Sequence, residues 1–205
     1  MSIELSRNHL AGFAKPASEA QGVFRAVLEA LARPTTPQRI AVAVAPPPPL
    51  GAVSGAIALT LCDAQSPVWL DRHLRTSDDV VAWLAFHTGA PLVDDPADAL
   101  FVFASSPSAV PPLARLAQGS DVEPHRSSTL LIDTTAAQPA GVFTATGPGI
   151  NGSTTWDSIG LPDGFVPQWQ ANHALFPRGV DLLLAGENTV VGLPRTTELV
   201  LKEAV

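Results

Sequence analysis

Several short segments of this chain are apolar along almost their whole length instead of alternating between apolar and polar side chains. They cover residues 100–104, 129–132 and 180–185. Strands of this composition are buried on both faces, which is typical of parallel sheets covered by other layers. Segments with helical spacing lie between them, and strands alternating with helices indicate the α/β class. We therefore expect a three-layer fold in which helices cover both faces of a sheet.

The last two expected strands indicate that this sheet contains both parallel and antiparallel strands. Residues 180–185 and 189–193 are separated by the turn sequence Gly186-Glu187-Asn188, which predicts an antiparallel hairpin. The other strands that we expect cover residues 39–45, 67–70 and 141–145.

The first expected helix begins at Ser18 and ends before Pro34. Ser18 and Gln21 have the spacing of a capping box, and apolar residues at 20, 24, 27, 28 and 31 share one helical face. Further helices are expected over residues 52–61, 110–117 and 165–175, and one that Thr76 or Ser77 caps and Gly89 ends. No internal repeat or linker divides the sequence, so we expect a single domain over residues 1–205.

Charge and cysteine content exclude several classes of protein. The net charge is −7, with 19 acidic against 12 basic side chains, which disfavours nucleic acid as a partner. Cys62 is the only cysteine and lies in an apolar run, so no disulfide within the chain is possible and a buried thiol is expected. The N-terminal sequence has no apolar targeting region and no stretch is long enough to span a membrane, so we expect a soluble, cytoplasmic protein.

No complete catalytic motif is present in the sequence. The phosphate-binding loop and the dinucleotide fingerprint are missing, and no cysteine or histidine spacing predicts a metal site. The nearest glycine-rich element is Gly147-Pro148-Gly149, which follows a predicted strand. Backbone N–H groups there are candidates for an anion-binding nest. The alternative is a tight turn, which is the commoner use of glycine and proline.

Three side chains are candidates for binding an anionic ligand. Arg178 and Arg195 each lie beside a proline at the edge of a predicted strand, where a guanidinium can clamp a phosphate or carboxylate. The alternative is that they pair with carboxylates such as Asp181 or Glu198, or face water. His87 shares a helical face with the apolar residues 80, 83 and 84, so it is either hydrogen-bonded in the core or directed at a ligand.

The four tryptophans divide into two groups by their surroundings. Trp69 and Trp83 lie in apolar segments and are expected in the core. Trp156 and Trp169 lie among polar residues, and large aromatic side chains are favoured anchors of protein interfaces. We therefore expect Trp156 and Trp169 at an interface, although filling the core is the commoner role of a large aromatic side chain.

Several motifs, in their order along the chain, resemble the PhnH family of the bacterial carbon–phosphorus lyase machinery. The resemblance runs from about residue 11 to about residue 200. The motifs are SEAQGVFRAVLEALARP at 18–34, LTLCDAQSPVWLD at 59–71, WLAFHTGAPL at 83–92, TGPGI at 146–150, ANHALFPRGVDLLL at 171–184 and LPRTT at 193–197.

The resemblance implies a part in phosphonate catabolism. Members of the family are homodimers when isolated, and they assemble with the subunits PhnG, PhnI and PhnJ into a core complex. That complex serves the transfer of a phosphonate onto the ribose of a nucleoside triphosphate, and PhnJ cleaves the carbon–phosphorus bond. Membership therefore implies a subunit with no activity of its own. It implies no catalytic residue.

The resemblance also implies a fold similar to that of pyridoxal phosphate-dependent transferases, without their cofactor. A Schiff base with that cofactor needs a lysine in the site. Lys15 and Lys202 are the only lysines and lie near the ends of the chain, so we expect no cofactor. Two alternatives remain open at this point. One is a stand-alone enzyme that acts on a phosphorylated metabolite through Arg178, Arg195 and His87, and the other is a scaffold that binds no small molecule.

Overall fold

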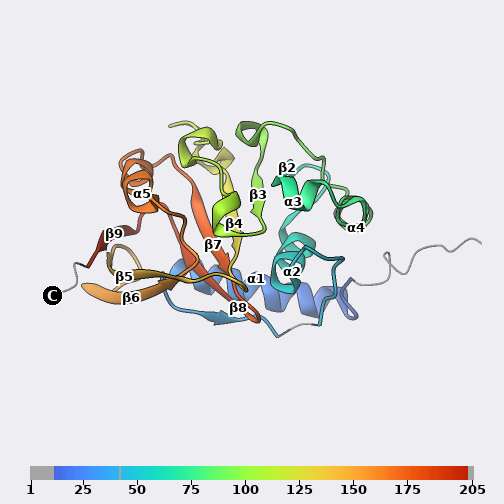
Figure 1. The fold of residues 1–205 in the computed structure, drawn as a ribbon, viewed down its shortest axis with the longest axis horizontal. Helices are drawn as coiled ribbons and strands as arrows, with labels where there is room; N and C mark the ends of the chain where they lie inside the picture. The colour runs from blue at the N-terminus through green and yellow to red at the C-terminus, as the bar shows by residue number, and fades with distance from the viewer. Residues whose placement is uncertain (1–11, 42, 203–205) are drawn as a thin grey trace, which may run out of the picture.

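The computed structural model describes residues 12–41 and 43–202. Its largest element is a six-stranded sheet, shown at the centre of Figure 1. The strands lie in the order β1 (Gln38–Arg39), β8 (Thr189–Leu193), β7 (Asp181–Ala185), β4 (Thr129–Asp133), β3 (Phe101–Ala104) and β2 (Val68–Leu70). Strands β2, β3, β4 and β7 are parallel, whereas β8 is antiparallel to both of its neighbours. This confirms an α/β fold with a mixed sheet.

Helices cover one face of this sheet. They are α1 (Pro16–Ala32), α2 (Ala52–Leu61) and α4 (Asp78–Thr88), and α4 follows the single turn α3 (Arg72–Arg75). Their buried side chains pack against Phe103, Leu131 and Leu183 of the sheet. Helix α1 approaches β8 closely because Gly192 has no side chain, and a Cβ there would lie 2.6 Å from the backbone of Ala30.

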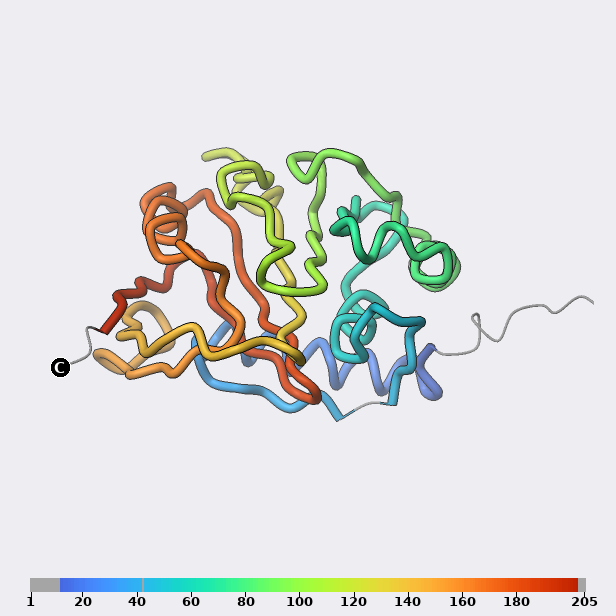
Figure 2. Tube along the Cα trace, viewed as in Figure 1, coloured from blue at the N-terminus to red at the C-terminus, as the bar shows by residue number. Residues whose placement is uncertain are grey.

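The other face is covered largely by a second sheet, which the sequence did not predict. This three-stranded sheet has the order β6 (Ser153–Ile159), β5 (Pro139–Thr146) and β9 (Glu198–Leu201). It packs with helix α5 (Phe165–His173) against the alternate residues of the central strands, Leu130, Ile132, Leu182 and Leu184. Figure 2 follows the chain from β4 into this sheet and back through α5 to β7. Helix α5 thus supplies part of the helical cover expected on this face, whereas the three-stranded sheet, which was not expected, supplies the rest.

Two helices have the bounds that the sequence predicts. Helix α2 has the predicted bounds, Ala52–Leu61. Helix α4 begins after Ser77, whose hydroxyl accepts a hydrogen bond from the Val80 backbone N–H, and it ends at Gly89 in the left-handed conformation. The carboxylates Asp78 and Asp79 lie in its first turn, where the helix dipole favours negative charge.

Three predicted elements differ from the structure. The helix expected over residues 110–117 is wrong, because the pair Pro111-Pro112 interrupts it and only a 3₁₀ turn forms at Leu113–Arg115. The strand expected over residues 39–45 is confined to Gln38–Arg39, and residue 42 lies outside the described residues. The first helix begins at Pro16 instead of Ser18.

The start of α1 uses a different capping arrangement from the one predicted. Proline suits the first helical position, where its missing N–H leaves no hydrogen bond unmade. Lys15 is the N-cap, and its backbone N–H donates to the Glu19 carboxylate at 3.0 Å. The segment expected to lack a targeting sequence, residues 1–11, lies outside the described residues. None of the helices in the described ranges has the length and apolarity needed to span a membrane.

Cys62 is expected to be unreactive in the folded chain. Burial, with a further contribution from the charge of Asp63, raises the pKa of its thiol from 9.0 to about 12. Only the thiolate is nucleophilic, and a thiol with a raised pKa forms very little of it at pH 8. The measurement is the rate of reaction with a chromogenic disulfide reagent at pH 8, which denaturant should raise strongly. A native chain that reacts as fast as a small free thiol would contradict this expectation.

Candidate functional site

Arg195 lies beyond the end of β8, at the edge where the parallel strands begin. Its Nε and Nη2 atoms donate to the two oxygens of the Asp181 carboxylate, at 3.1 and 2.5 Å. Nη1 donates to the backbone carbonyls of Pro124 and Pro177, and Nη2 also donates to the Ser127 hydroxyl at 2.6 Å. These contacts use all five N–H groups of a guanidinium. Pairing with Asp181, the alternative weighed from the sequence, is therefore the arrangement in the structure.

Arg178 lies at the same edge of the sheet, just before β7. Its Nε atom lies 3.1 Å from an oxygen of Asp121, and the two side chains are 40% and 80% exposed. Ion pairs of this kind are screened by water and contribute little to stability. The structure thus gives Arg178 a carboxylate partner too.

Gly147 and Gly149 both have positive φ, at +131° and +86°. A Cβ on Gly147 would lie 2.6 Å from the Thr196 carbonyl oxygen, and one on Gly149 would collide with the carbonyl oxygen of Ala32. The glycines therefore let this turn pack against backbone on two sides. A tight turn accounts for both residues.

His87 lies far from the two arginines. It belongs to α4, and its ring centroid lies 4.9 Å from that of Trp83 and 5.0 Å from that of Phe86. The backbone of Gly12 packs directly on the imidazole. Arg195 instead neighbours α5, because its carbonyl oxygen lies 2.9 Å from the Nδ1 atom of His173. Figure 1 shows α4 and α5 at opposite ends of the molecule, so the structure does not gather the predicted ligand-binding residues into one site.

The two tryptophans expected at an interface are buried within the chain. Trp169 is fully buried, stacks on Phe165 and donates its indole N–H to the Thr197 carbonyl at 2.7 Å. Trp156 is buried beside Phe143 under the three-stranded sheet. The interface prediction for Trp156 and Trp169 is therefore corrected: the polar neighbours in the sequence are the outward residues of a strand and a helix whose other sides face the core.

The opposite edge of the sheet, where the parallel strands end, carries a different group of polar residues. In open α/β sheets this carboxyl edge is the usual place for a ligand. Asp71 follows β2 and Ser105 follows β3. One oxygen of the buried Asp71 carboxylate accepts from the Ser105 N–H and hydroxyl at 2.5 and 2.6 Å, and the other accepts from the Leu74 N–H at 2.9 Å. Asp71 thereby ties the two strand ends together and caps α3.

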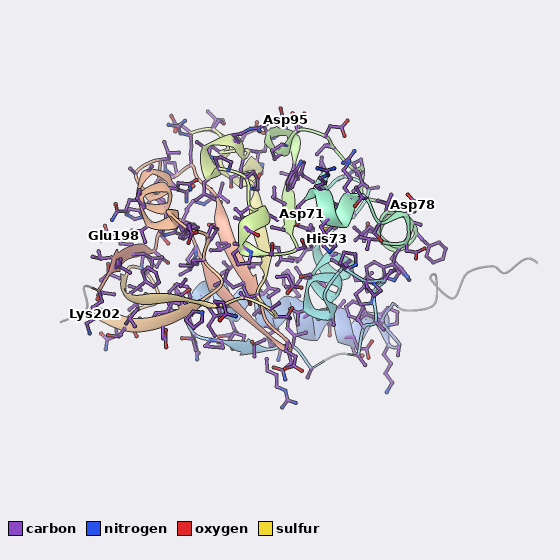
Figure 3. All side chains as sticks on the ribbon, viewed as in Figure 1. Asp71, His73, Asp78, Asp95, Glu198 and Lys202 are labelled. Carbon is purple, nitrogen blue, oxygen red and sulfur yellow. The ribbon has the colours of Figure 1, made fainter. Side chains whose placement is uncertain are left out.

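A hollow of about 690 Å³ lies beside these strand ends. Figure 3 labels Asp71 and His73, which lie close together near β3 and α3. Arg72 and His73 supply the basic groups of the hollow, and Trp69 contributes an aromatic ring. Asp71 also lines the hollow, and both oxygens of its carboxylate accept the hydrogen bonds described above. The other lining residues are small or hydroxyl-bearing: Thr76, Ser105, Ser106 and Ala109. A sequence signal for this site existed, because Asp71-Arg72-His73 and Ser105-Ser106 directly follow two predicted strands.

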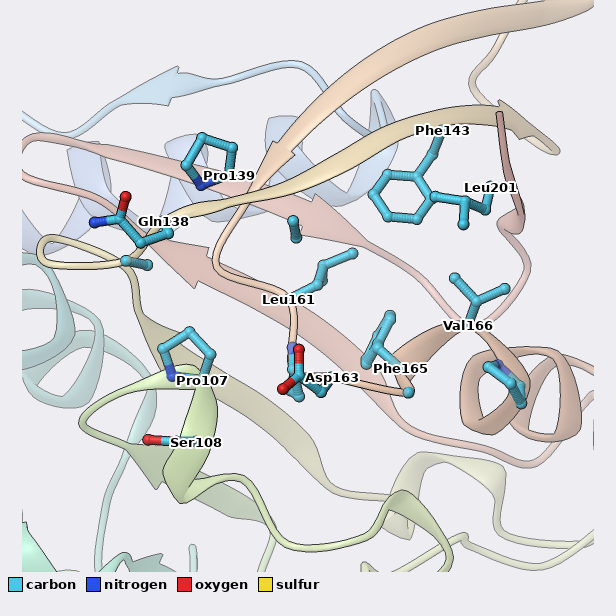
Figure 4. Close-up of a pocket in the computed structure, with 15 residues that line it drawn as sticks. Pro107, Ser108, Gln138, Pro139, Phe143, Leu161, Asp163, Phe165, Val166 and Leu201 are labelled. Carbon is cyan, nitrogen blue, oxygen red and sulfur yellow. The ribbon is translucent and has the colours of Figure 1, made fainter. Parts of the chain in front are cut away.

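A second hollow of about 640 Å³ is lined by the three-stranded sheet, the start of α5 and the turn at Pro107-Ser108, and is shown in Figure 4. Its lining is mainly apolar, with Phe143, Leu161, Phe165 and Leu201 among its residues and Asp163 at its rim. A lining of this kind suits apolar side chains better than a charged metabolite.

The comparison with known families decides the identity of the chain. A sequence profile described as "Bacterial phosphonate metabolism protein (PhnH)" matches residues 11–200. This chain belongs to the PhnH family. Its relatives include a Rhizobium meliloti (strain 1021) protein named alpha-D-ribose 1-methylphosphonate 5-triphosphate synthase subunit PhnH. The two are 43% identical over 194 residues, which cover 95% of this chain and 96% of the relative.

A second relative of this PhnH-family chain is named as a putative subunit of a carbon–phosphorus lyase. It is the HtxG protein of Stutzerimonas stutzeri, 34% identical over 86 residues, which cover 42% of this chain and 44% of that protein. Within the described parts of the PhnH-family chain, no three histidine, cysteine or acidic side chains gather as a metal site. The chemistry that its carboxyl-edge groups suit best is the binding of an anion.

Proposed function

We propose that this chain is a non-autonomous subunit of a carbon–phosphorus lyase core complex in the cytoplasm. In that role it is needed for the transfer of a phosphonate onto the ribose of a nucleoside triphosphate, which yields ribose 1-methylphosphonate 5-triphosphate. The observation that carries the proposal is the 43% identity, over 95% of the chain, to a relative named as a subunit of that synthase. The match covers 95% of this chain and 96% of the relative, so it supports the same role for the chain as a whole.

The proposal extends to partners: a second copy of the chain in isolation, and PhnG, PhnI and PhnJ in the complex. Exposed apolar side chains on the three-stranded sheet support a protein contact there. Val142, Ile159 and Val200 are between 39% and 57% exposed, although each belongs to a regular strand. Val142 pairs with Asp157, two residues before Ile159, and Thr144, two residues after Val142, pairs with Val200. The three apolar side chains therefore lie near one another on the outer face of this sheet.

The edges of the same sheet support this location. In the described part of the chain, β6 and β9 each have a strand neighbour on one side only, so each presents unpaired backbone groups. Open strand edges of this kind are sites where another chain adds a strand. The apolar hollow of Figure 4 lies on the inner side of the sheet and includes Leu201, which is 53% exposed. Covering these surfaces in a complex would remove apolar area from water.

Charge substitutions on the outer face of the sheet test the proposed contact. The variants Val142→Glu and Ile159→Glu place a carboxylate among the exposed apolar side chains, and they are expected to reduce assembly at least tenfold because a buried unpaired charge is costly. The matched control is Val122→Glu, since Val122 is 89% exposed and lies in a loop outside the three-stranded sheet.

Assembly is measured by co-purification with the other subunits and by light scattering of the chain alone. We expect Val142→Glu and Ile159→Glu to fold as the parent does but to lose a partner subunit or the homodimer. Val122→Glu should assemble normally. Normal assembly of all three variants would contradict the proposed contact surface.

A further inference from the structure

We propose that the hollow at the carboxyl edge of the sheet binds a phosphate-type oxyanion: the phosphate of a small organic phosphate or the phosphonate group of an organophosphonate. Arg72 supplies the positive charge, His73 supplies a ring N–H donor, and the residues that follow β2 and β3 line the hollow. This site lies at the opposite edge of the sheet from Arg178 and Arg195. It also involves no residue of the three-stranded sheet, so it stands or falls independently of the assembly surface.

The first support is the difference between arginines whose guanidinium groups already have partners and those whose guanidinium groups have none among the described residues. Arg195 is saturated by its own partners, and Arg75 is paired with Asp94. Among the described residues, no carboxylate lies within ion-pair distance of Arg72, and its guanidinium makes no hydrogen bond to another described group. Arg25 and Arg39 share this property, but Arg72 differs from both in lining the hollow. A guanidinium left with its donors free inside a hollow is suited to a bidentate contact with an oxyanion.

The second support is the rigidity of the residues around Arg72. Asp71 is 2% exposed and holds the first turn of α3 through Leu74 and the end of β3 through Ser105. Both of its oxygens thus accept hydrogen bonds from neighbouring groups, which leaves the guanidinium next to it available. A fixed backbone at Arg72 and His73 lowers the ordering cost of binding a ligand.

The third support is the hydroxyl-bearing loop at Ser105-Ser106, which lines the same hollow as Arg72. The Ser106 hydroxyl lies 3.0 Å from the Ser108 hydroxyl, and a hydroxyl in such a pair can accept from its partner and donate to a ligand oxygen. Thr76 also lines the hollow, but its hydroxyl donates to the Arg72 carbonyl at 2.9 Å and stabilises the end of α3. Ser106 is therefore the hydroxyl placed to donate to the anion.

Trp69 and the size of the hollow indicate that the anion carries an organic group. The indole N–H of Trp69 donates to the Asp94 carbonyl at 3.2 Å, which holds the ring in place as one wall. Ligand sites for small organic molecules have volumes of about 300–1,000 Å³, and the hollow, at about 690 Å³, is much larger than inorganic phosphate needs. We therefore infer that the organic part of the ligand packs on Trp69.

Calorimetric titration of the full chain tests this site with three probes: inorganic phosphate, methylphosphonate and adenosine 5′-monophosphate. The variant Arg72→Gln is expected to weaken binding of the organic probes by about 10-fold to 100-fold, the usual effect of losing a charge-assisted contact. The matched control is Arg39→Gln, which removes the same charge from an exposed arginine outside the hollow. It is expected to change the affinity by less than about twofold.

The probes also separate the possible sources of the anion. Tighter binding of adenosine 5′-monophosphate than of methylphosphonate, lost in Trp69→Ala, indicates a ligand with a flat organic group. Tighter binding of methylphosphonate indicates a small organophosphonate. Backbone amide shifts in an NMR titration should centre on Arg72, His73 and Ser106.

Three results would overturn the proposal: no binding of any probe, equal loss in Arg72→Gln and Arg39→Gln, or amide shifts centred on the residues around Arg195. The thermal midpoint of Arg72→Gln serves as the folding control, and it should stay within a few degrees of the parent because the side chain is exposed. Assembly with the other subunits is scored separately, so failure at this site leaves the proposed function standing.

Discussion

Replacing Arg195 by leucine is expected to lower the free energy of unfolding by about 3–5 kcal/mol, the usual cost of removing one partner from a buried ion pair. The side chains of Arg195 and Asp181 are only 14% and 22% exposed, so Asp181 would be left as a largely buried charge without its partner. The carbonyls of Pro124 and Pro177 and the hydroxyl of Ser127 would also lose a donor. The damage would spread over the loops before β4 and β7.

Urea denaturation followed by tryptophan fluorescence measures this change. The matched control is Arg178→Leu, because Arg178 and its partner Asp121 are 40% and 80% exposed. An exposed ion pair contributes about 0–1 kcal/mol, so the control should change stability by no more than that. Equal, small effects of the two substitutions would show that Arg195 is not the structural residue described above.

Replacing Trp169 by alanine is expected to cost about 3–5 kcal/mol, the range for removing a large aromatic side chain from a core. Trp169 is fully buried between α5 and β9, where it stacks on Phe165. Its indole N–H also satisfies the carbonyl of Thr197, the residue just before β9. The substitution would therefore loosen β9 and the edge of the three-stranded sheet.

The variant Trp169→Phe separates the two contributions, because it keeps a ring in the core and removes only the hydrogen bond and part of the volume. It is expected to cost about 1–3 kcal/mol, the penalty for leaving a buried carbonyl unsatisfied. Thermal unfolding and urea denaturation should rank the two variants in this order. A stable Trp169→Ala chain that instead fails to assemble would contradict the core position and favour an interface role.

The central strands and helix α4 were predictable because their sequence signals are local, or because several signals agree. Strands β3, β4 and β7 have a core on each side and therefore read as apolar runs, which periodicity alone identifies as doubly buried. Helix α4 combines the cap Ser77, first-turn carboxylates and the stop signal Gly89, so several independent preferences agree on its bounds.

A strand was predicted over residues 141–145, which lie within β5, but the three-stranded sheet was missed because β6 and β9 carry weaker local signals. Strand β6, with sequence STTWDSI, is polar at most positions, and β9 has four residues. Strand β9 pairs with β5 through residues that are remote in sequence, such as Thr146 and Glu198. The burial of Trp156 and Trp169 follows from that sheet, so both interface predictions were wrong for the same reason.

The candidate site was missed because the sequence shows which side chains carry charge, but not which charges are already paired. Arg195 stands out beside a proline, yet Asp181, 14 residues away, pairs with it once the hairpin forms. Arg72 is inconspicuous in sequence, and its free guanidinium becomes apparent only when β2 and β3 are placed side by side. Which polar side chains meet at the edge of a parallel sheet, and which of them remain unpaired, depends on how the strands are arranged in the folded chain.

The most direct test of the central claim, that this chain works only as a subunit, is an assay of purified chain with nucleoside triphosphate and methylphosphonate. The same assay is run with PhnG, PhnI and PhnJ, with and without the chain, and ribose 1-methylphosphonate 5-triphosphate is measured by ³¹P NMR. We predict no product from the chain alone, product from the full set, and loss of product when the chain is omitted. Robust turnover by the chain alone, or undiminished turnover without it, would contradict the account.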